Sequence, residues 1–398
     1  MALSLLDLLA ATLRDIQGNW VRSGLTALGI FMGVAAVNAT LNIDAISTAQ
    51  LQAKLAERDR PYVIPWAYDP QRLRPSVQLT EADLKTIQQE IEGIAGYSIG
   101  TELFSFSEVR FSDKSATSVN VVGVSPTFQE TTGRRLIEGR FFNTTDFEQF
   151  YPVVIIDEVL AEQLFQGELA IGQGIYVGTT RFTVVGISET KRQWVNSDPQ
   201  GELWMTRAYA NVLSGGLSFD RPQLSLQALE NYQAVQTALE QWLQTQYPGY
   251  IVQVWGNAAD LYREEQQQRI SSRVFKSMGV LALVIGGVGI ANITVAAVVE
   301  RTREIGLRRA LGATDFEVMA QFVVEAAVLS LVGGLVAVTT VHFATKTAAV
   351  QIFETPYEFR IQDALTSMGA AFVVGVGSSF LPALRVTRLD VVDALRGE

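Results

Sequence analysis

The sequence has 398 residues, 18% of them charged, with a mean hydropathy of +0.19 and a formal net charge of −10. A positive mean hydropathy in a chain with this many charged residues indicates that the apolar residues are concentrated in some segments, while other segments have an ordinary water-exposed surface. The acidic balance argues against nucleic acid as a partner, because phosphate binding needs a basic face. The chain has no cysteine, which excludes a disulfide framework, a thiol nucleophile and a cysteine-ligated metal site.

Residues 1–22 predict an amphipathic helix at the cytoplasmic face of the membrane. Its apolar side chains fall on one helical face and its polar ones largely on the other, as in helices that lie among lipid headgroups. The apolar face comprises Leu5, Leu6, Leu9, Leu13, Ile16 and Trp20. The apolar run that follows is longer than the ~7–15 residues of a cleaved signal peptide, so we expect an uncleaved anchor.

Four apolar segments follow along the chain, at residues 23–43, 277–299, 318–345 and 364–384. Each is long enough to cross a membrane, which takes roughly 20 residues. Among the four, the third alone holds titratable side chains, Glu325 and His342. The fold class predicted is therefore an α-helical membrane protein with four transmembrane spans, at residues 23–45, 271–299, 316–345 and 363–385.

The distribution of Lys and Arg near the span ends predicts the orientation in the membrane. Four arginines lie in the short segment 300–315, whereas the external loop 346–362 has only Lys346 and Arg360. The N-terminal helix and the tail 386–398 also carry arginines. We therefore expect both termini and the segment 300–315 in the cytoplasm, and the region 46–270 on the periplasmic or extracellular side of the inner membrane.

The region 46–270 predicts a large extracytoplasmic α+β domain. Residues 46–269 hold 18 basic and 27 acidic side chains, so most of the negative charge lies here. A capping-box pattern at Thr80–Asp83 predicts a short helix through Ile91, and an apolar stripe predicts a longer helix over 232–246. β-Branched runs predict strands at 119–124, 153–156, 182–187, 224–229 and 251–255, with loops near 196–201 and 214–222. We expect two subdomains, 46–125 with 220–270, and 126–219.

The polar stretch 260–276 favours a helix and runs directly into the second span. A helix continuous through both would couple the external domain mechanically to the membrane.

The sequence contains no recognisable catalytic or cofactor-binding motif. It lacks a G-x-x-x-x-G-K-[ST] phosphate loop, and its single histidine, His342, excludes a multi-histidine metal centre. The adjacent carboxylates Asp157-Glu158 and Glu264-Glu265 are interpreted as solvated surface. We expect a non-catalytic chain with no cofactor or metal of its own.

Polar and small residues within the spans predict helix packing. Glu325 lies roughly 14 Å along the third span, where a carboxylate either pairs with a neighbouring arginine or acts as a structural switch or conduit. Asn38 and Asn292 favour hydrogen bonds between helices over substrate contacts. Small residues at packing positions are Gly29, Gly33, Gly286, Gly287, Gly289, Gly375 and Ser379. They let backbones approach closely, within the chain or against a second copy.

The segment between the second and third spans has the most informative pattern. It predicts a short basic amphipathic helix that ends at Gly312, with Thr314 or Asp315 capping the third span. Its residues are Arg301, Arg303, Glu304, Ile305, Gly306, Leu307, Arg308, Arg309, Ala310, Leu311, Gly312 and Ala313. Two alternatives stay open, because such a helix can lie on anionic lipid or dock in a groove of a soluble partner.

Several stretches spread over the chain carry a family resemblance. They are residues 22–37, 123–128 with 138–142, 286–313 with Gln321 and Glu325, and 382–396. These stretches resemble the FtsX-like permease family and, within it, the MacB type of ABC transporter membrane subunit. The block 286–313 is the most specific of them.

The resemblance implies a homodimer whose helix at 301–313 couples each protomer to an ABC ATPase subunit. ATP and Mg²⁺ would bind that ATPase, and a periplasmic adaptor protein would complete an efflux machine. Motion driven by ATP would pass along the spans to the outer domain, which is mechanotransmission without a membrane channel. A full-length MacB carries its own N-terminal ATPase and this sequence has none, so we expect the ATPase on a separate chain.

Three functions are considered on this basis. An efflux permease is the first, and a signal transmitter of the FtsX kind or a lipoprotein-releasing permease is the second. A membrane enzyme is disfavoured by the missing motifs. Binding of an adaptor or of a cell-wall hydrolase to the external domain would discriminate between efflux and signalling.

Overall fold

In the computed structural model the chain divides into two compact units, Met1–Gln50 with Gln267–Glu398, and Leu51–Gln266. The structure describes residues 12–386 except for 13, 15, 19, 72, 193–199, 216–217 and 352–358. Most of the predicted interface helix 1–22 and nearly all of the tail 386–398 lie outside the described residues, as does most of the loop predicted at 196–201. We call the two parts the helical unit and the sheet unit.

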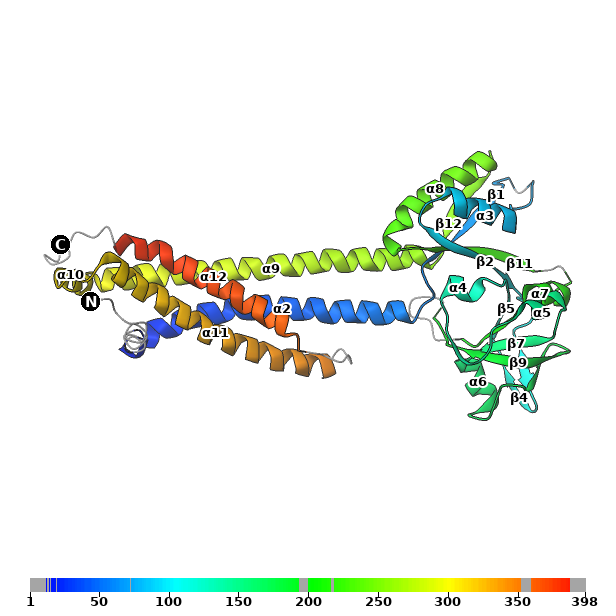
Figure 1. Ribbon diagram of the computed structural model, residues 1–398, viewed down its shortest axis with the longest axis horizontal. Coiled ribbons are helices and arrows are strands. Elements are labelled where there is room, and N and C mark those ends of the chain that lie inside the picture. Colours follow the sequence, from blue (N-terminus) through cyan, green and yellow to red (C-terminus); the bar gives the residue numbers. More distant parts are fainter. Residues whose placement is uncertain are drawn as a thin grey trace. The chain divides into compact units, whose positions relative to one another are not determined.

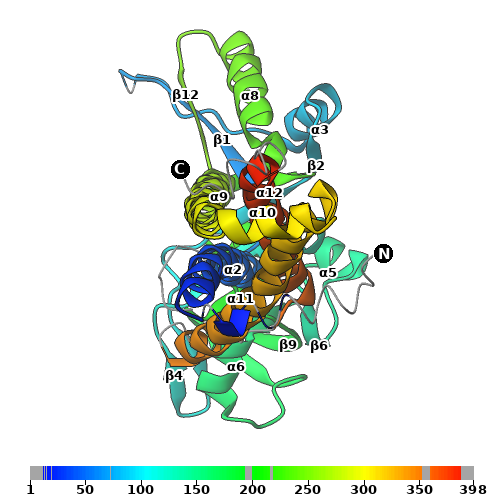
Figure 2. The ribbon, with the colours of Figure 1, turned by 90° about the vertical axis from the view of Figure 1, so that its left-hand side faces the viewer.

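Long helices form the helical unit, which Figures 1 and 2 show from two directions. They are α2 (Trp20–Ala56), α9 (Asn257–Glu300), α11 (Asp315–Gln351) and α12 (Ile361–Val386), and the short α10 (Thr302–Ala310) connects α9 to α11. All four long helices have the length and apolar composition needed to cross a membrane. The predicted four-span architecture is therefore confirmed.

Helix α9 is longer than its predicted span. It continues from Asn257 to Glu300 as one helix of 44 residues, so the polar stretch 260–276 and the second span form a single element, as predicted. Helix α2 likewise continues past its span, as far as Ala56.

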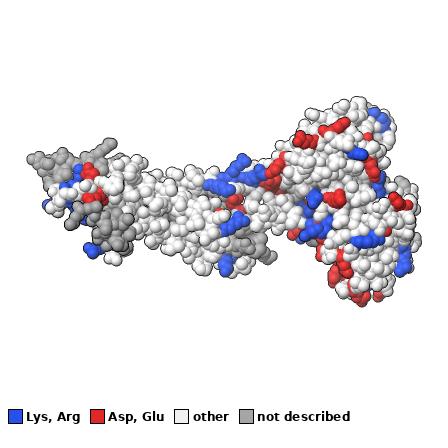
Figure 3. All heavy atoms as spheres, in the orientation of Figure 1, with Lys and Arg blue, Asp and Glu red and all other residues white. Residues whose placement is uncertain are grey.

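Charged side chains gather near both ends of the helical unit. Figure 3 shows uncharged side chains in the band between, on the face in view. At one end Lys276 Nζ lies 3.1 Å from Asp44 Oδ2, and at the other Arg22 Nη1 lies 3.6 Å from Glu300 Oε2. This is the pattern of helices whose middle faces lipid and whose ends face water.

The sheet unit is built on one mixed sheet. Among the described residues it has twelve strands, in the order β12-β1-β11-β2-β5-β10-β7-β9-β8-β3-β4, with β6 paired to β9. The strands are β1 (Tyr62–Tyr68), β2 (Ile94–Glu102), β3 (Val109–Phe111), β4 (Lys114–Ala116), β5 (Asn120–Val124), β6 (Leu136–Gly139), β7 (Val153–Asp157), β8 (Gly174–Val177), β9 (Thr180–Ser188), β10 (Glu202–Thr206), β11 (Phe219–Leu226) and β12 (Ile251–Trp255). Most pairs are antiparallel, but β10 with β5 and β7 with β9 are parallel.

Short helices connect the strands and cover the sheet. They are α3 (Glu81–Glu90), α4 (Phe128–Thr132), α5 (Thr144–Glu148), α6 (Glu158–Phe165), α7 (Arg207–Leu213) and α8 (Tyr232–Gln246), with a 3₁₀ turn at Leu229–Asn231. The capping box predicted at the start of α3 is present, with Thr80 and Asp83 bonding each other's backbone N–H. Helix α8 has the bounds that its apolar stripe predicted.

Two large hydrophobic cores divide the sheet unit. One gathers apolar residues of β1, β2 and β11 under α3 and α8, including Val63, Ile99 and Leu239. The other gathers residues 103–121 with residues of β7–β10, α6 and α7. This division differs from the predicted subdomains, which put all residues up to 125 in the first. The reason is that β3 pairs with β4 and β8, which places residues 103–121 in the second core.

Two further expectations about this unit are wrong. The loop predicted at 214–222 ends earlier, because β11 already begins at Phe219 and Pro222 is paired with Ile99. Asp157 is buried rather than solvated: it is the N-cap of α6, accepting a hydrogen bond from Leu160 N at 2.9 Å and another from Thr190 Oγ1 at 2.7 Å. Burial is the main cause that raises the pKa of Asp157 to about 6, against the lowering effect of those hydrogen bonds.

Candidate partner-docking surface

A single residue, Arg301, separates α9 from α10, and it occupies the N-cap position of α10. Thr302 Oγ1 donates hydrogen bonds to the carbonyl oxygens of Val298 and Val299, at 3.0 and 2.9 Å. These bonds satisfy two backbone acceptors at the end of α9, and they therefore stabilise the turn between α9 and α10. The predicted helix at this position is therefore present.

One face of α10 is buried against the long helices. Ile305 is 4% exposed and packs with Val298, Val318 and Phe322 in a small hydrophobic core, and Gly306 beside it is also buried. The core joins α10 to α9 and α11.

Arginines of α10 bond to α10 itself and to the start of α11. Arg308 donates to Glu304 Oε1 at 2.6 Å and to Gln321 Oε1 at 2.9 Å, and Arg309 Nε lies 2.7 Å from Asp315 Oδ1. These pairs are partly exposed and contribute little stability each, but together they fix the direction in which α10 points.

The connection from α10 to α11 follows the predicted capping. Gly312 has a left-handed backbone (φ +102°), a conformation that favours glycine. Thr314 Oγ1 then accepts from Glu317 N at 3.3 Å while Thr314 N donates to Glu317 Oε2 at 2.9 Å, which is a capping box for α11.

The opposite side of α10 carries large exposed apolar side chains. Leu307 is 53% exposed, Leu311 is 81% exposed, and Phe316 in the first turn of α11 is 70% exposed. Arg303, Glu304, Ala310 and Gly312 are exposed around them, and Arg301 and Ala313 are half-buried. Side chains of this kind fit an apolar groove on another molecule, since a contiguous exposed apolar patch marks a contact with a protein or with a membrane. Phe316 was missed from the sequence because it lies after the capping residue and reads as part of the third span.

Predicted packing residues lie where helices approach. A Cβ at Gly286 would lie 3.0 Å from Gly29 O, and one at Gly33 would lie 3.4 Å from Leu283 Cδ1, so α2 and α9 are in close contact there. A Cβ at Gly287 would lie 2.7 Å from side chains of α12, and one at Gly375 would meet Ser330 of α11. Ser379 is buried on α12. Gly289 differs from the rest, because a Cβ there would meet nothing within 4 Å.

The intramembrane polar residues divide into buried and exposed ones. Asn38 Nδ2 donates to Ser367 Oγ of α12 at 3.0 Å, and Asn42 Nδ2 donates to Asn38 Oδ1 at 3.2 Å, so Asn38 makes the predicted bond between helices. Asn292 is exposed on α9, and its predicted hydrogen bond to another helix stays a prediction. Glu325 is 9% exposed and lines a small cavity with Arg22, Thr26 and Thr294. Its predicted role as an ion-pair partner or switch stays a prediction.

The described residues do not include a group of three or more His, Asp or Glu side chains arranged to hold a metal ion.

Comparison with family models identifies the class of protein. Residues 23–242 match the MacB-like periplasmic core domain, and residues 276–391 match the FtsX-like permease C-terminal domain. The chain belongs to the MacB-like, FtsX-like permease family of ABC transporter membrane proteins. The resemblance found in the sequence is confirmed, and α10 lies within the second matched region.

Individual relatives are similar over nearly the whole chain. A macrolide export ATP-binding/permease protein MacB from Rhodospirillum rubrum is 29% identical, covering 100% of this chain and 61% of its own length. MacB 2 from Aeromonas hydrophila is 28% identical over 95% of this chain and 58% of its own, and the pyoverdine export protein PvdT from Pseudomonas putida is 28% identical over 99% and 60%. The chain thus spans about three-fifths of these relatives' length.

Among solved structures, the periplasmic region of MacB from Actinobacillus actinomycetemcomitans resembles part of this chain. The matched region covers 55% of this chain and 98% of that structure, with 17% sequence identity and a TM-score of 0.42.

Proposed function

We propose that this chain is a permease subunit that relays the motion of an ABC-type ATPase to its extracytoplasmic sheet unit, for export of a small molecule. The observation that carries the proposal is α10, which is anchored by Ile305 and presents Leu307, Leu311 and Phe316 outward. An apolar knob on a basic helix fits a groove of a soluble partner, which is the helix-in-groove mode of recognition.

Two further observations support a partner over a lipid surface. The arginines Arg308 and Arg309 are engaged in ion pairs within the chain, whereas a helix lying on anionic lipid keeps its basic side chains available for headgroups. The apolar side chains also project at the turn between two helices that can cross a membrane, a position that reaches beyond the span ends.

The finer parts of the proposal come from the relatives' names and from the charge pattern. Relatives are named as export proteins, so we place this chain in efflux, with its ATP and Mg²⁺ bound by the ATPase. We also propose the inner membrane as its location, with both termini and α10 in the cytoplasm, a homodimer as its assembly, and a periplasmic adaptor as a further partner. Helix α9, continuous from Asn257 to Glu300, is the element that we assign to the relay.

The test compares Leu307→Asp with a matched control, Leu73→Asp. Leu73 is 79% exposed in the sheet unit, so we expect an aspartate there to affect folding as little as an aspartate at Leu307. The ATPase that copurifies with the tagged chain is reconstituted with each variant in lipid nanodiscs and its ATP hydrolysis is measured. We expect Leu307→Asp to abolish the stimulation of hydrolysis by the permease, because a carboxylate cannot enter an apolar groove without losing its hydration.

Equal stimulation by both variants would remove the docking assignment from α10. Loss of stimulation in both would show that the substitution acts through folding.

A further inference from the structure

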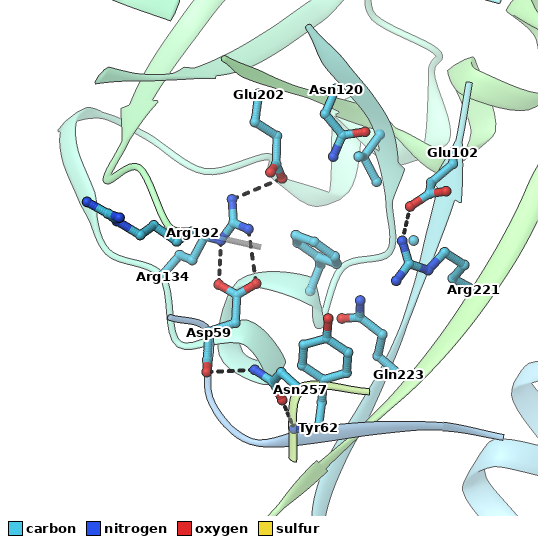
Figure 4. A pocket seen from close by; sticks show the side chains of 13 residues that line it. Asp59, Tyr62, Glu102, Asn120, Arg134, Arg192, Glu202, Arg221, Gln223 and Asn257 are labelled. Atoms are coloured by element: carbon cyan, nitrogen blue, oxygen red, sulfur yellow. Dashed lines mark hydrogen bonds and ion pairs between the residues drawn. The ribbon is translucent and has the colours of Figure 1, made fainter. Parts of the chain in front are cut away.

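The sheet unit contains a polar cavity of about 50 Å³, partly open to solvent. Figure 4 shows its lining, which comes from β1, β2, β5, β10 and β11 and from Asp59, Arg134 and Asn257 beside them. This volume holds a few water molecules or the polar groups of a ligand. The predictions made from the sequence did not include such a site.

The charges that line the cavity cancel. Arg134, Arg192 and Arg221 stand against Asp59, Glu102 and Glu202. Arg134 bonds both oxygens of Asp59, at 2.6 and 3.0 Å, and its Nη1 lies 2.9 Å from Glu202 Oε1. Arg221 pairs with Glu102 on the other side. Each carboxylate already has an arginine, and Arg192 pairs with Glu57 outside the lining, at 3.0 Å. A charged ligand therefore gains no free counter-ion here, and the lining favours an uncharged one.

Two buried polar atoms in the lining have no hydrogen-bond partner among the residues that the structure describes. They are Gln223 Oε1, an acceptor, and Arg221 Nε, a donor. Gln223 is only 9% exposed, and buried polar groups nearly always find a hydrogen-bond partner. The two residues are two positions apart on β11, so both side chains stand on one face of the sheet, about 7 Å apart at the backbone. A ligand that both donates and accepts would satisfy them together.

Tyr62 adds a third polar group between the two ion-paired clusters. Burial, and after it the charge of Asp59, raises the pKa of Tyr62 to about 12. Its hydroxyl therefore keeps its proton at neutral pH and is available to donate as well as to accept.

Aromatic rings that do not line the cavity itself stand on the same face of the sheet, next to the lining residue Arg221, and we call them its aromatic border. The Arg221 guanidinium lies 5.2 Å from the centre of the Trp255 ring, and the Trp66 and Phe219 rings are 5.1 Å apart. Phe219 is paired with Glu102 and lies two residues before Arg221, so it shares their face. Trp255 is 38% exposed, which leaves part of its ring for a ligand.

We propose that this cavity and its aromatic border bind an uncharged, hydroxyl-rich ring compound of the saccharide type. Each hydroxyl of such a ring both donates and accepts, so neighbouring hydroxyls can serve Gln223 Oε1 and Arg221 Nε at once. The C–H face of the ring can pack on Trp255. The same chemistry is offered by a free saccharide and by a saccharide attached to an apolar group.

The test uses saturation-transfer NMR on the full chain in lipid nanodiscs prepared without glycoside detergent. The probes are methyl α-D-glucopyranoside for a free saccharide and phenyl β-D-glucopyranoside for one with an apolar substituent, with glucuronate as the charged comparison. We expect saturation transfer to the neutral probes and about tenfold weaker binding of glucuronate. Tighter binding of the phenyl glycoside than of the methyl glycoside would show that the ligand is a saccharide attached to an apolar group. Equal binding of the two would show that it is a free saccharide.

Gln223→Met removes the unpartnered acceptor while keeping the length of the side chain. We expect about tenfold weaker binding of the neutral probes, with no loss in the thermal unfolding midpoint, because Oε1 has no partner to lose among the described residues. Gln236→Met is the matched control, since Gln236 lies on α8 and bonds Glu240. It should bind the probes as the unchanged chain does.

Absence of saturation transfer to both neutral probes would overturn the proposal and show that the cavity holds water alone. Equal losses in Gln223→Met and Gln236→Met, or binding of glucuronate as tight as that of the neutral probes, would overturn it as well. No ATPase takes part in this experiment, so its outcome is independent of the function proposed for α10.

Discussion

The two units stabilise their interiors with different side chains. In the helical unit, glycines such as Gly286 and Gly333 bring helix backbones into contact, and the uncharged amide of Asn38 bonds one helix to another. In the sheet unit, large aliphatic side chains fill the cores, and the cavity between strands holds fully paired charges such as Arg134 with Asp59. The difference follows from the solvent, because lipid gives no hydrophobic drive for burying a large side chain and close backbone contact takes its place.

The comparison also shows what each kind of interior tolerates. In the sheet unit, a buried charge is stable only beside its partner of opposite charge, and a buried carboxyl only while it is protonated. In the helical unit, a contact between two backbones requires that the residue there has no side chain. Each of these dependences can be tested with one substitution and one matched control.

The largest effect is expected from Arg134→Met. The change leaves Asp59 and Glu202 buried without their counter-ion, and removing one member of a buried ion pair costs about 3–5 kcal/mol. Asp59 and Glu202 together hold the pKa of Arg134 above its ordinary value although burial lowers it, so this guanidinium stays charged. Hydrogen exchange of β5 and β10 in the full chain would show the loss as faster exchange.

The neighbouring Arg135→Met is the control for that experiment. Its side chain is 86% exposed and its ion pair with Glu189 is long, at 3.6 Å. We expect a change in the free energy of unfolding within about 0.5 kcal/mol. Similar exchange rates for the two variants would mean that the buried ion pair does not stabilise the strands around it.

A smaller effect, of opposite sign, is expected from Asp157→Asn. The folded-state pKa of Asp157, about 6, is above its unfolded value of 3.8. Its contribution to stability is therefore fully present below about pH 4 and is lost as the pH rises through 6. At pH 7.5 ionisation destabilises the fold by about 3 kcal/mol, which asparagine would remove while still capping α6.

Urea unfolding of the full chain at pH 4 and 7.5, followed by near-UV circular dichroism, would measure this effect. The variant should exceed the unchanged chain in stability at pH 7.5 and match it at pH 4. Asp113→Asn, at an exposed aspartate, should leave the pH dependence as it is. If Asp157→Asn also left it unchanged, Asp157 would not be the group that titrates.

The smallest effect is expected from Gly286→Ala in the helical unit. The added methyl would lie 3.0 Å from Gly29 O, so α2 and α9 would have to separate, at a cost of about 1–3 kcal/mol. Gly289→Ala is the control, because its methyl would meet nothing within 4 Å and alanine favours helix by about 1 kcal/mol.

The separation of α2 and α9 can be measured by energy transfer between two dyes. Because the chain has no cysteine, one cysteine introduced on each helix can carry the dye pair. Energy transfer during unfolding by SDS would report the separation of the two helices. Equal stability of the two alanine variants would show that the contact at Gly286 is not tight in the membrane.

Local patterns in the sequence predicted much of this molecule. The four spans, helix α8 and the capping box at Thr80 each depend on residues that are close along the chain, so their periodicity or spacing was sufficient. Helix α10 was predicted for the same reason, but the pattern grouped Ile305 with Leu307 and did not separate the buried side chain from the exposed one. What the pattern could not tell is which apolar residues of α10 and α11 stay exposed, because that depends on how the helices pack.

Features built from distant segments could not be predicted. The cavity brings together Asp59, Glu102, Arg134, Glu202 and Arg221, which are up to 162 positions apart in the sequence. The burial of Asp157 depends on β9 and β10 as neighbours of β7, and the exposure of Asn292 depends on where α12 lies. Asp157 and the charged residues of the cavity are of types that suit a surface, and only the tertiary arrangement brings them into the interior.

The side chain of Asn257 has a mechanical consequence. It is the first residue of α9, its Nδ2 donates to the carbonyl oxygens of Asp59 and Arg60 at 3.0 and 3.2 Å, and its Oδ1 accepts from Tyr62 N at 2.8 Å. One amide group thus joins the first turn of α9 to the backbone between α2 and β1, and the ion pair of Arg58 with Glu264, at 3.0 Å, braces the same junction. A force applied to the first turn of α9 is therefore passed directly to the residues that follow α2, through the amide of Asn257 and the ion pair of Arg58.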